Sequence, residues 1–341
     1  MSSRVYCTCF DHRYLPRGLA LIESLRHNGV VDDIFVLCFD GAAFDAMTRL
    51  AVPGVKLVTV AALEVAYPDL TQARANRSLI EFYYTCTPAI TEFAFMQTPE
   101  AQHTTYLDAD LWFFANPDLV FAEIGDGATA IIPHNFAKKK KARERFGIFN
   151  VGWVTFARSE EGLRCLAWWR DRCIEWCYGR IDGKRFADQG YLGQFAEIAP
   201  STKVIGHKGC NTAPWNIGNY RVRKRETGVF LDDDPLIFFH FHGVDRDFRF
   251  FYFDSHRLYG APHSAVIRND IYRPYITRLL DKEALARAVL PEAGAGRVKL
   301  RGNNILGLDL KNMRRRAMRL AFEVADLASG RPILAWNGQV Y

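Results

Sequence analysis

Residues 105–114, TYLDADLWFF, hold two carboxylates, Asp108 and Asp110, inside an otherwise apolar run rich in strand-forming residues. On a continuous strand, side chains two positions apart project from the same face, which leaves room between these acids for one hard cation. Buried carboxylates need a partner, and no Lys or Arg stands between Gln97 and Phe136 to neutralise them. The pair therefore predicts a divalent metal site.

An Asp-x-Asp at a strand end is also common as a turn or a helix cap, and that interpretation stays open for the tripeptide alone. The residues that follow, Asn116-Pro117-Asp118, are typical of a short helix with Asn116 as its N-cap and Pro117 at its first position. The acids thus stand at a strand-to-loop transition, where open α/β sheets place their ligand sites.

The elements that must position these acids follow the order of a parallel sheet. Apolar strands at 5–10, 33–39 and 55–60 alternate with helical patterns at 14–27 and 43–50. A long helix at 77–96, expected to break near Pro88, leads into the acidic segment. The remaining expected elements are strands at 128–133, 149–156 and 237–242, a helix at 159–176 and a helix beginning at 188.

Composition narrows the class of protein. With 341 residues, 49% of them hydrophobic and 24% charged, the chain is long enough for one large globular domain with an appendage. It lacks an apolar run of about 18 residues and a signal pattern, so we expect a cytoplasmic protein. No dinucleotide or P-loop fingerprint is present, which argues against dehydrogenases and P-loop phosphotransferases. The eight cysteines form no CxxC pair, and we expect buried free thiols.

The positive charge is concentrated at the C-terminal end. From residue 291 onward, nine Lys and Arg face four acids, which accounts for five of the six net charges. Helical patterns at 264–290 and a basic amphipathic segment at 311–324 predict a helical extension over 261–341. The basic segment fits the inner surface of the cell membrane, or equally packs on the core. Its clusters are short and carry no nucleic-acid recognition motif, so no nucleic acid is expected as a partner.

Four segments resemble, in the same order, motifs of metal-dependent glycosyltransferases of the GT-A fold, most like family 8 and its bacterial surface-polysaccharide relatives. They are Tyr106-Leu-Asp-Ala-Asp110 for DxD, Phe149-Asn-Val-Gly-Trp153 for FNxG, Asp188-Gln189 for DQ and His240-Phe-His-Gly243 for HFxG. The resemblance covers residues 4–250 and is specific as an ordered set. It implies a Rossmann-like mixed sheet flanked by helices, with residues 1–260 as the nucleotide-sugar transferase domain.

The resemblance also implies a ligand set. Asp108, Asp110 and His240 would bind Mn²⁺ or Mg²⁺, with His242 as an alternate because it shares a strand face with His240. A sugar diphosphate is a poor electrophile until a cation neutralises its leaving group.

Three further residues would face the donor sugar. Asn150 would contact it, Asp188 would bind its hydroxyls, and Gln189 would lie near the anomeric carbon. A Gln side chain is a weak nucleophile, which favours retention by front-face attack over double displacement.

Further donor contacts come from the same resemblance, with a UDP-sugar as the expected donor. Cys9 and Tyr14 belong to the opening that binds the nucleobase, and Arg77 lies where related enzymes place a basic contact. Beyond Gly243 the family continues to a Lys-Pro-Trp; here Arg246 falls at the lysine position and the Pro-Trp is missing.

Two segments each have two interpretations. The loop at 211–220 contains Trp215 and Asn216, a mix of indole and amides that suits a saccharide acceptor but also occurs in ordinary packed loops. The run KKKKARER at 138–145 is typical of a solvated mobile loop, with a role in closing over an anionic ligand as the alternative.

The sequence therefore favours a hexosyltransferase that uses a nucleotide-diphosphate sugar and a saccharide or lipid-linked saccharide acceptor. A sugar-phosphate nucleotidyltransferase is the alternative within enzymes, although Cys9-Phe10-Asp11 offers no Gly-rich loop with a basic residue after the first strand. A non-catalytic basic binding protein is the alternative from another class.

Overall fold

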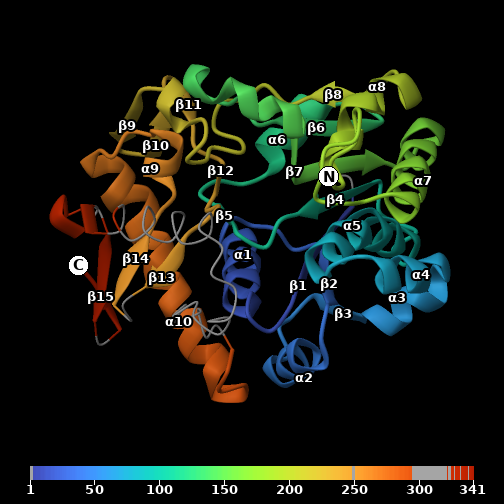
Figure 1. Cartoon of the computed structure of the whole chain (residues 1–341), viewed down its shortest axis with the longest axis horizontal. Helices are drawn as coiled ribbons and strands as arrows, with labels where there is room; N and C mark the ends of the chain where they lie inside the picture. Colours follow the sequence, from blue (N-terminus) through green and yellow to red (C-terminus); the bar gives the residue numbers. More distant parts are fainter. Residues whose placement is uncertain are drawn as a thin grey trace, which may run out of the picture.

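The computed structural model describes residues 3–247, 250–293, 321, 324–325, 327–330, 332–336 and 338–341. Figure 1 shows these residues as a central sheet covered by helices, with the C-terminal strands at one side of the molecule. Within the described part of the chain, no helix is both long and apolar enough to cross a membrane.

The central sheet has seven strands in the order β3-β2-β1-β4-β7-β6-β8. Its first four strands are parallel, and β7 then runs antiparallel between β4 and β6. The expected α/β fold with a mixed sheet is therefore confirmed. The strands are β1 Arg4–Phe10, β2 Asp33–Cys38, β3 Val55–Thr59, β4 His103–Leu107, β6 Thr129–Pro133, β7 Phe149–Ala157 and β8 Lys203–Val204.

Helices cover both faces of this sheet because alternate residues of β1 and β2 are apolar on both sides. Val5 and Phe35 pack in one hydrophobic cluster, whereas Tyr6 and Ile34 pack in the other. The first cluster includes α3 Val60–Ala66, α4 Asp69–Asn76, α5 Leu79–Met96, α7 Glu160–Glu175 and α8 Phe195–Ile198. The second includes α1 Leu15–His27, α2 Gly41–Leu50 and α6 Asp118–Ile124.

The acidic segment is not one continuous strand, and the acids lie after a strand end, as the predicted strand-to-loop transition requires. Strand β4 ends at Leu107, the two acids lie in a turn, and β5 begins at Leu111. Strand β5 Leu111–Phe113 leaves the main sheet and pairs with β12 Phe238–His240. Because the chain turns between β4 and β5, Asp108 and Asp110 do not lie on one regular strand. A shared strand face is therefore not what brings the two acids together.

Other elements differ from expectation in informative ways. Helix α5 runs unbroken through Pro88. It begins at Leu79, because Ser78 and Glu81 form a reciprocal capping box there. Helices α3 and α4 were not anticipated. The basic run forms the short 3₁₀ helix η1 Lys138–Phe146. All eight cysteines are free, seven of them buried and Cys9 half-buried.

The described part of the C-terminal region packs onto the rest of the fold. The π-helical turn η4 Ile267–Tyr272 leads into α10 Arg273–Val289, whose Tyr275 stacks on Phe241 with ring centroids 3.7 Å apart. Strand β15 Ile333–Trp336 pairs with β14 Phe251–Phe253. A separate unit over 261–341 stays a prediction, and most of the expected basic helix at 311–324 lies outside the described residues.

The remaining strands and short helices lie after α7. They are η2 Gln189–Gln194, η3 Ile217–Asn219, β9 Val222–Arg225, β10 Gly228–Leu231, β11 Asp234–Pro235, β13 Asp245–Asp247, α9 His256–Tyr259 and β16 Gln339–Val340.

Candidate metal and substrate site

A cavity of about 580 Å³ opens where β1 and β4 end, and residues from both halves of the chain line it. Asp108 and Asp110 come from the turn after β4, Asn150 from β7, and His240 from the end of β12. Carboxyl ends of parallel strands meet at one edge of a sheet, which is where α/β folds bind ligands. Four of the motifs distant in sequence therefore meet in one place.

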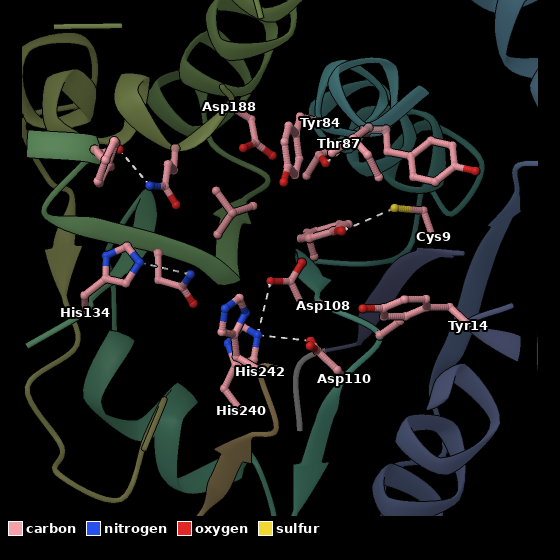
Figure 2. A pocket seen from close by; sticks show the side chains of 18 of the residues that line it. Cys9, Tyr14, Tyr84, Thr87, Asp108, Asp110, His134, Asp188, His240 and His242 are labelled. Atoms are coloured by element: carbon pink, nitrogen blue, oxygen red, sulfur yellow. Dashed lines mark hydrogen bonds and ion pairs between the residues drawn. The ribbon is translucent and has the colours of Figure 1, made fainter. Parts of the chain in front are cut away.

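The imidazole of His240 faces both acids (Figure 2). Its Nε2 atom lies 3.0 Å from Oδ1 of Asp110 and 3.8 Å from Oδ2 of Asp108. Backbone pairing fixes this approach, since the N–H of Phe241 donates to the carbonyl of Asp110 at 2.9 Å. The turn and the end of β12 thus hold their side chains at a common point.

Two neighbours orient the His240 ring from behind. Its Nδ1 atom lies 3.4 Å from Oδ1 of Asn211, so the amide oxygen accepts the Nδ1 proton, and Nε2 is the nitrogen that faces the acids. Gly152 supplies the space, because a Cβ there would lie 2.5 Å from Oδ1 of Asn150 and 3.0 Å from Nδ1 of His240. This is a physical reason for the glycine of the Phe149–Trp153 motif.

Burial and charge act in opposite directions on these groups. Burial raises the pKa of Asp108 to about 6, although His240 partly offsets this effect. Burial would likewise raise the pKa of Asp110, but attraction and a hydrogen bond from His240 outweigh it and hold that pKa at about 2. The pKa of His240 is raised because Asp110 outweighs the desolvation of the ring. The unliganded cluster is thus held together by an Asp110–imidazolium pair.

The residues present fit a divalent ion of the Mn²⁺ or Mg²⁺ kind. Ligand atoms of Asp110, His240 and His242 lie within 4.8 Å of one another, and Asp108 lies beside His240. A set of carboxylate oxygens with imidazole nitrogen suits Mn²⁺ better than Ca²⁺. His242, expected only as an alternate, therefore lies within the same cluster as His240.

Asn150 and His134 form the wall next to the metal cluster. Oδ1 of Asn150 accepts from the N–H of Gly152 at 3.0 Å, and its Nδ2 lies 3.4 Å from Nε2 of His134. Burial lowers the pKa of His134 to about 4, so its ring is neutral at pH 7 and Nε2 accepts this proton. Asn150 is therefore fixed in orientation before any ligand arrives.

Asp188 points into the cavity from the side opposite His240, next to Tyr84 and Thr87 (Figure 2). Burial, with a smaller contribution from Asp108, raises its pKa to about 7, while a hydrogen bond with Thr87 acts in the other direction. The preceding Ala187 has a left-handed backbone, φ +46°, a conformation that costs an alanine about 1 kcal/mol. That local strain accompanies the placement of the Asp188 carboxyl in the cavity.

Gln189 lines the cavity but already has a partner. Its Nε2 donates to the carbonyl of Phe146 at 2.7 Å, which ties the end of η1 to the segment that carries Asp188. The amide nitrogen therefore has a structural contact in the unliganded protein.

Aromatic rings form another part of the cavity wall, together with Cys9 and with Tyr14, which lies beside Asp110 (Figure 2). The ring of Phe39 stacks on Tyr83 with centroids 3.7 Å apart, and the Tyr14 ring is 45% exposed. Cys9 is within 3.3 Å of the Tyr106 hydroxyl, and burial raises its pKa, so it is a neutral thiol. Flat walls with one exposed ring suit a planar base.

Trp215 lines the cavity near the metal cluster, as its predicted role requires, whereas Asn216 does not line it. The Trp215 ring lies 5.0 Å from that of His240, centroid to centroid. Asn216 is buried and donates to the carbonyls of His134 and Asn211, each at 2.9 Å. Its amide therefore secures the loop, which does not support the expected acceptor contact.

Three expected donor contacts also lie outside the residues that line the cavity. Arg77 donates to the carbonyls of Cys173 and Ile174, at 3.3 and 2.7 Å. Arg246 forms an ion pair with Glu283 at 3.0 Å. Gly243 has a backbone role: it adopts φ +75° in the turn after β12, a conformation that favours glycine. Both arginines bind protein acceptors away from the cavity, and their positions do not support the predicted roles.

Sequence reasoning missed several residues that line the cavity: His134, Thr87, Tyr83, Tyr84 and Tyr259. Arg143 also lines it and belongs to the basic run whose alternative interpretation is closing over an anionic ligand. One signal was available for His134, because it directly follows β6 at the same sheet edge as Asp108. No local pattern marks Tyr259 or the face of α5 that carries Tyr84.

The sheet order, the acids after β4 and the facing histidine define a protein of the GT-A glycosyltransferase fold. The structure superposes on galactosyltransferase LgtC, solved with donor and acceptor sugar analogues, with a TM-score of 0.51 and 14% identity. The match covers 83% of this chain and 95% of LgtC. At this identity the likeness establishes the fold.

The chain belongs to the same family as two Bacillus subtilis proteins, YfnD and YfnF. It is 30% identical to YfnD over 286 residues, which cover 82% of this chain and 89% of YfnD. It is 31% identical to YfnF over 246 residues, 70% of this chain and 80% of YfnF. Both relatives are described as uncharacterized. No protein-family model matches the chain.

Proposed function

We propose that this protein is a metal-dependent glycosyltransferase, of the family 8 type, that transfers a hexose from a nucleotide-diphosphate sugar to a saccharide or lipid-linked saccharide. The observation that carries the proposal is the convergence of Asp108, Asp110 and His240 at one end of the cavity with Asp188 facing them from the other. Between them lies a space that a sugar diphosphate can occupy, with aromatic rings beyond for a base.

The cation-binding end would receive the leaving group. A divalent ion held by Asp108, Asp110 and His240 would act there as a Lewis acid on the diphosphate. The protein contributes orientation, since Asn211 fixes the His240 tautomer and Gly152 leaves room for the ring. This preorganisation reduces the reorganisation needed when charge develops on the diphosphate.

The residues on the other wall would hold the sugar. Asn150 presents an amide fixed by Gly152 and His134, and Asp188 presents a carboxyl that can accept from sugar hydroxyls. Gln189 stands next to Asp188 and lines the cavity, and its amide is the group expected near the anomeric carbon.

This arrangement favours retention by attack on the same face. The bond between the anomeric carbon and the β-phosphate oxygen breaks with its electron pair going to that oxygen. The acceptor hydroxyl oxygen forms the new bond to the same carbon, and its proton passes to the departing phosphate oxygen. Gln189 is too weak a nucleophile for a stable glycosyl-enzyme intermediate.

The proposal is tested by incubating the full chain with UDP-glucose, UDP-galactose and other nucleotide sugars, with Mn²⁺ or with EDTA. We expect hydrolysis or transfer that requires the divalent ion and falls at least a hundredfold in Asp110→Asn. Activity that persists in EDTA, or near-normal turnover of Asp110→Asn, would contradict the proposed mechanism. Asp233→Asn is a matched control, because Asp233 is an exposed acid outside the cavity.

A further inference from the structure

The cavity needs a positive charge that its metal cluster does not supply. A divalent ion is balanced by the two carboxylates of Asp108 and Asp110, whereas each phosphoryl group of a donor diphosphate carries one negative charge. Two more acids, Asp11 and Asp188, line the same cavity. Binding an anion beside several buried acids is unfavourable unless a cation pairs with it. This reasoning rests on the proposed function.

The arginine expected at this position from the sequence is occupied elsewhere. Arg246 forms its ion pair with the buried Glu283, whose side chain also accepts from Tyr252 at 3.1 Å. Arg17 is the other nearby cation, but its guanidinium lies 4.6 Å from the Tyr14 ring centroid and donates to the carbonyl of Val244. Neither arginine lines the cavity.

Arg143 does line the cavity, and among the described residues it is the one Lys or Arg that does. Its guanidinium carbon lies 4.9 Å from the centroid of Tyr259, whose ring is 6.4 Å from that of His242, centroid to centroid. Within the described part of the chain, no carboxylate forms an ion pair with Arg143. The Tyr259 ring thus lies between the Arg143 guanidinium and His242 of the metal cluster, and no carboxylate of the described residues pairs with the guanidinium.

The 3₁₀ helix that carries Arg143 is tied down at both ends by residues of the cavity wall. The N–H of Ala137 donates to the carbonyl of Trp215 at 3.0 Å, and Gln189 donates to the carbonyl of Phe146 at 2.7 Å. No side chain of η1 is buried, so its packing is slight. These two contacts, together with the packing of the Phe146 ring on Phe186, hold η1 at the cavity.

We propose that Arg143 binds the diphosphate of the nucleotide-sugar donor, in place of the cation expected at Arg246. The planar guanidinium can donate two parallel N–H bonds to phosphate oxygens, which a lysine cannot reproduce. It lies on the same side of the cavity as His242, where the diphosphate would meet the metal cluster. As the bond to the sugar breaks, the same contact stabilises the negative charge that collects on the β-phosphate oxygen.

The test measures binding rather than turnover. Isothermal titration of the full chain in Mn²⁺ compares UDP with uridine for the wild type, Arg143→Gln, Arg143→Lys and Arg145→Gln. We expect Arg143→Gln to weaken UDP binding about tenfold to a hundredfold and to leave uridine binding unchanged. Arg143→Lys should be intermediate. Arg145→Gln is the matched control, because Arg145 is an exposed neighbour on η1 that does not line the cavity.

Two results would overturn the inference. The first is wild-type UDP affinity in Arg143→Gln with an unchanged melting temperature. The second is an equal or larger loss in Arg246→Gln in a folded protein. Failure of the proposed function is distinguishable, because the wild type would then bind none of UDP, GDP, ADP, CDP or dTDP in Mn²⁺; that result would overturn both proposals.

Discussion

The Nε2 atom of His240 lies 3.0 Å from Oδ1 of Asp110, across the junction between the β12 strand end and the turn after β4. These two side chains are an ion pair when no cation is present, since the pKa of His240 is raised and that of Asp110 is held at about 2. Binding a divalent ion must displace the proton from the imidazole. Metal affinity and proton release are therefore linked at this pair.

Replacing His240 by Gln should abolish tight Mn²⁺ binding, because the nitrogen that faces both acids is lost. We expect a drop in Mn²⁺ affinity of about a hundredfold, measured by electron paramagnetic resonance without any nucleotide. His242→Gln should cost less, about tenfold or below, because Asn211 orients His240 and no such partner is described for His242. An equal loss in both variants would mean that His242 is a full ligand.

Gly152→Ala should damage the same cluster by crowding. Its new Cβ would lie 2.5 Å from Oδ1 of Asn150 and 3.0 Å from Nδ1 of His240, so both side chains must move. We expect unfolding in urea to show a loss of about 1 to 3 kcal/mol, together with weaker Mn²⁺ binding. Gly193→Ala is the control, since nothing lies within 4 Å of its Cβ position. A fully stable Gly152→Ala protein with normal Mn²⁺ affinity would show that the ring relaxes freely.

Arg77→Gln should lower stability without changing ligand affinity. Arg77 is 9% exposed and donates to two backbone carbonyls in the last turn of α7, so its loss leaves both without that partner. We expect a loss of about 2 kcal/mol in the free energy of unfolding. UDP affinity, measured below the melting transition, should stay within twofold. A large loss of UDP affinity in a folded variant would restore the donor role expected from the sequence.

Stability should fall with acid through His134. Burial holds the pKa of this ring at about 4, below its ordinary value of 6.5, so only the unfolded chain binds a proton between those values. As pH falls from 6.5 to 4, the folded state loses stability, on the order of 3 kcal/mol from this group. His134→Gln should remove that part of the slope in urea unfolding curves recorded in EDTA. Parallel slopes for the two proteins would contradict a neutral buried His134.

The fold could be predicted well from the sequence because its elements are local and strongly patterned. The alternation of apolar strands and helices from Arg4 to Thr59 predicted the parallel strands, and four ordered motifs predicted which strand ends would meet. The sequence predicts the strand-to-loop transition at Asp108 but not the separate strand β5 that follows the turn. Such a turn depends on the pairing of β5 with β12, which comes from much later in the chain.

The partners of individual arginines could not be predicted, for a related reason. Arg77, Arg143 and Arg246 are all basic residues near motif segments, and their types alone do not distinguish them. Tertiary contacts decide: Arg77 donates to carbonyls in the last turn of α7, Arg246 pairs with Glu283 on α10, and Arg143 lines the cavity. Each partner lies far away in the sequence.

The pairing of β5 with β12 also determines the stage of folding at which the metal site can form. His240 is the register partner of Leu111, so the acids of the first third of the chain meet the imidazole of the last third only after a long loop closes. Such non-local contacts form slowly, because chain entropy is lost before they stabilise anything. During refolding, affinity for Mn²⁺ should therefore appear after helix content has recovered, which makes the ion a reporter of the last step of assembly.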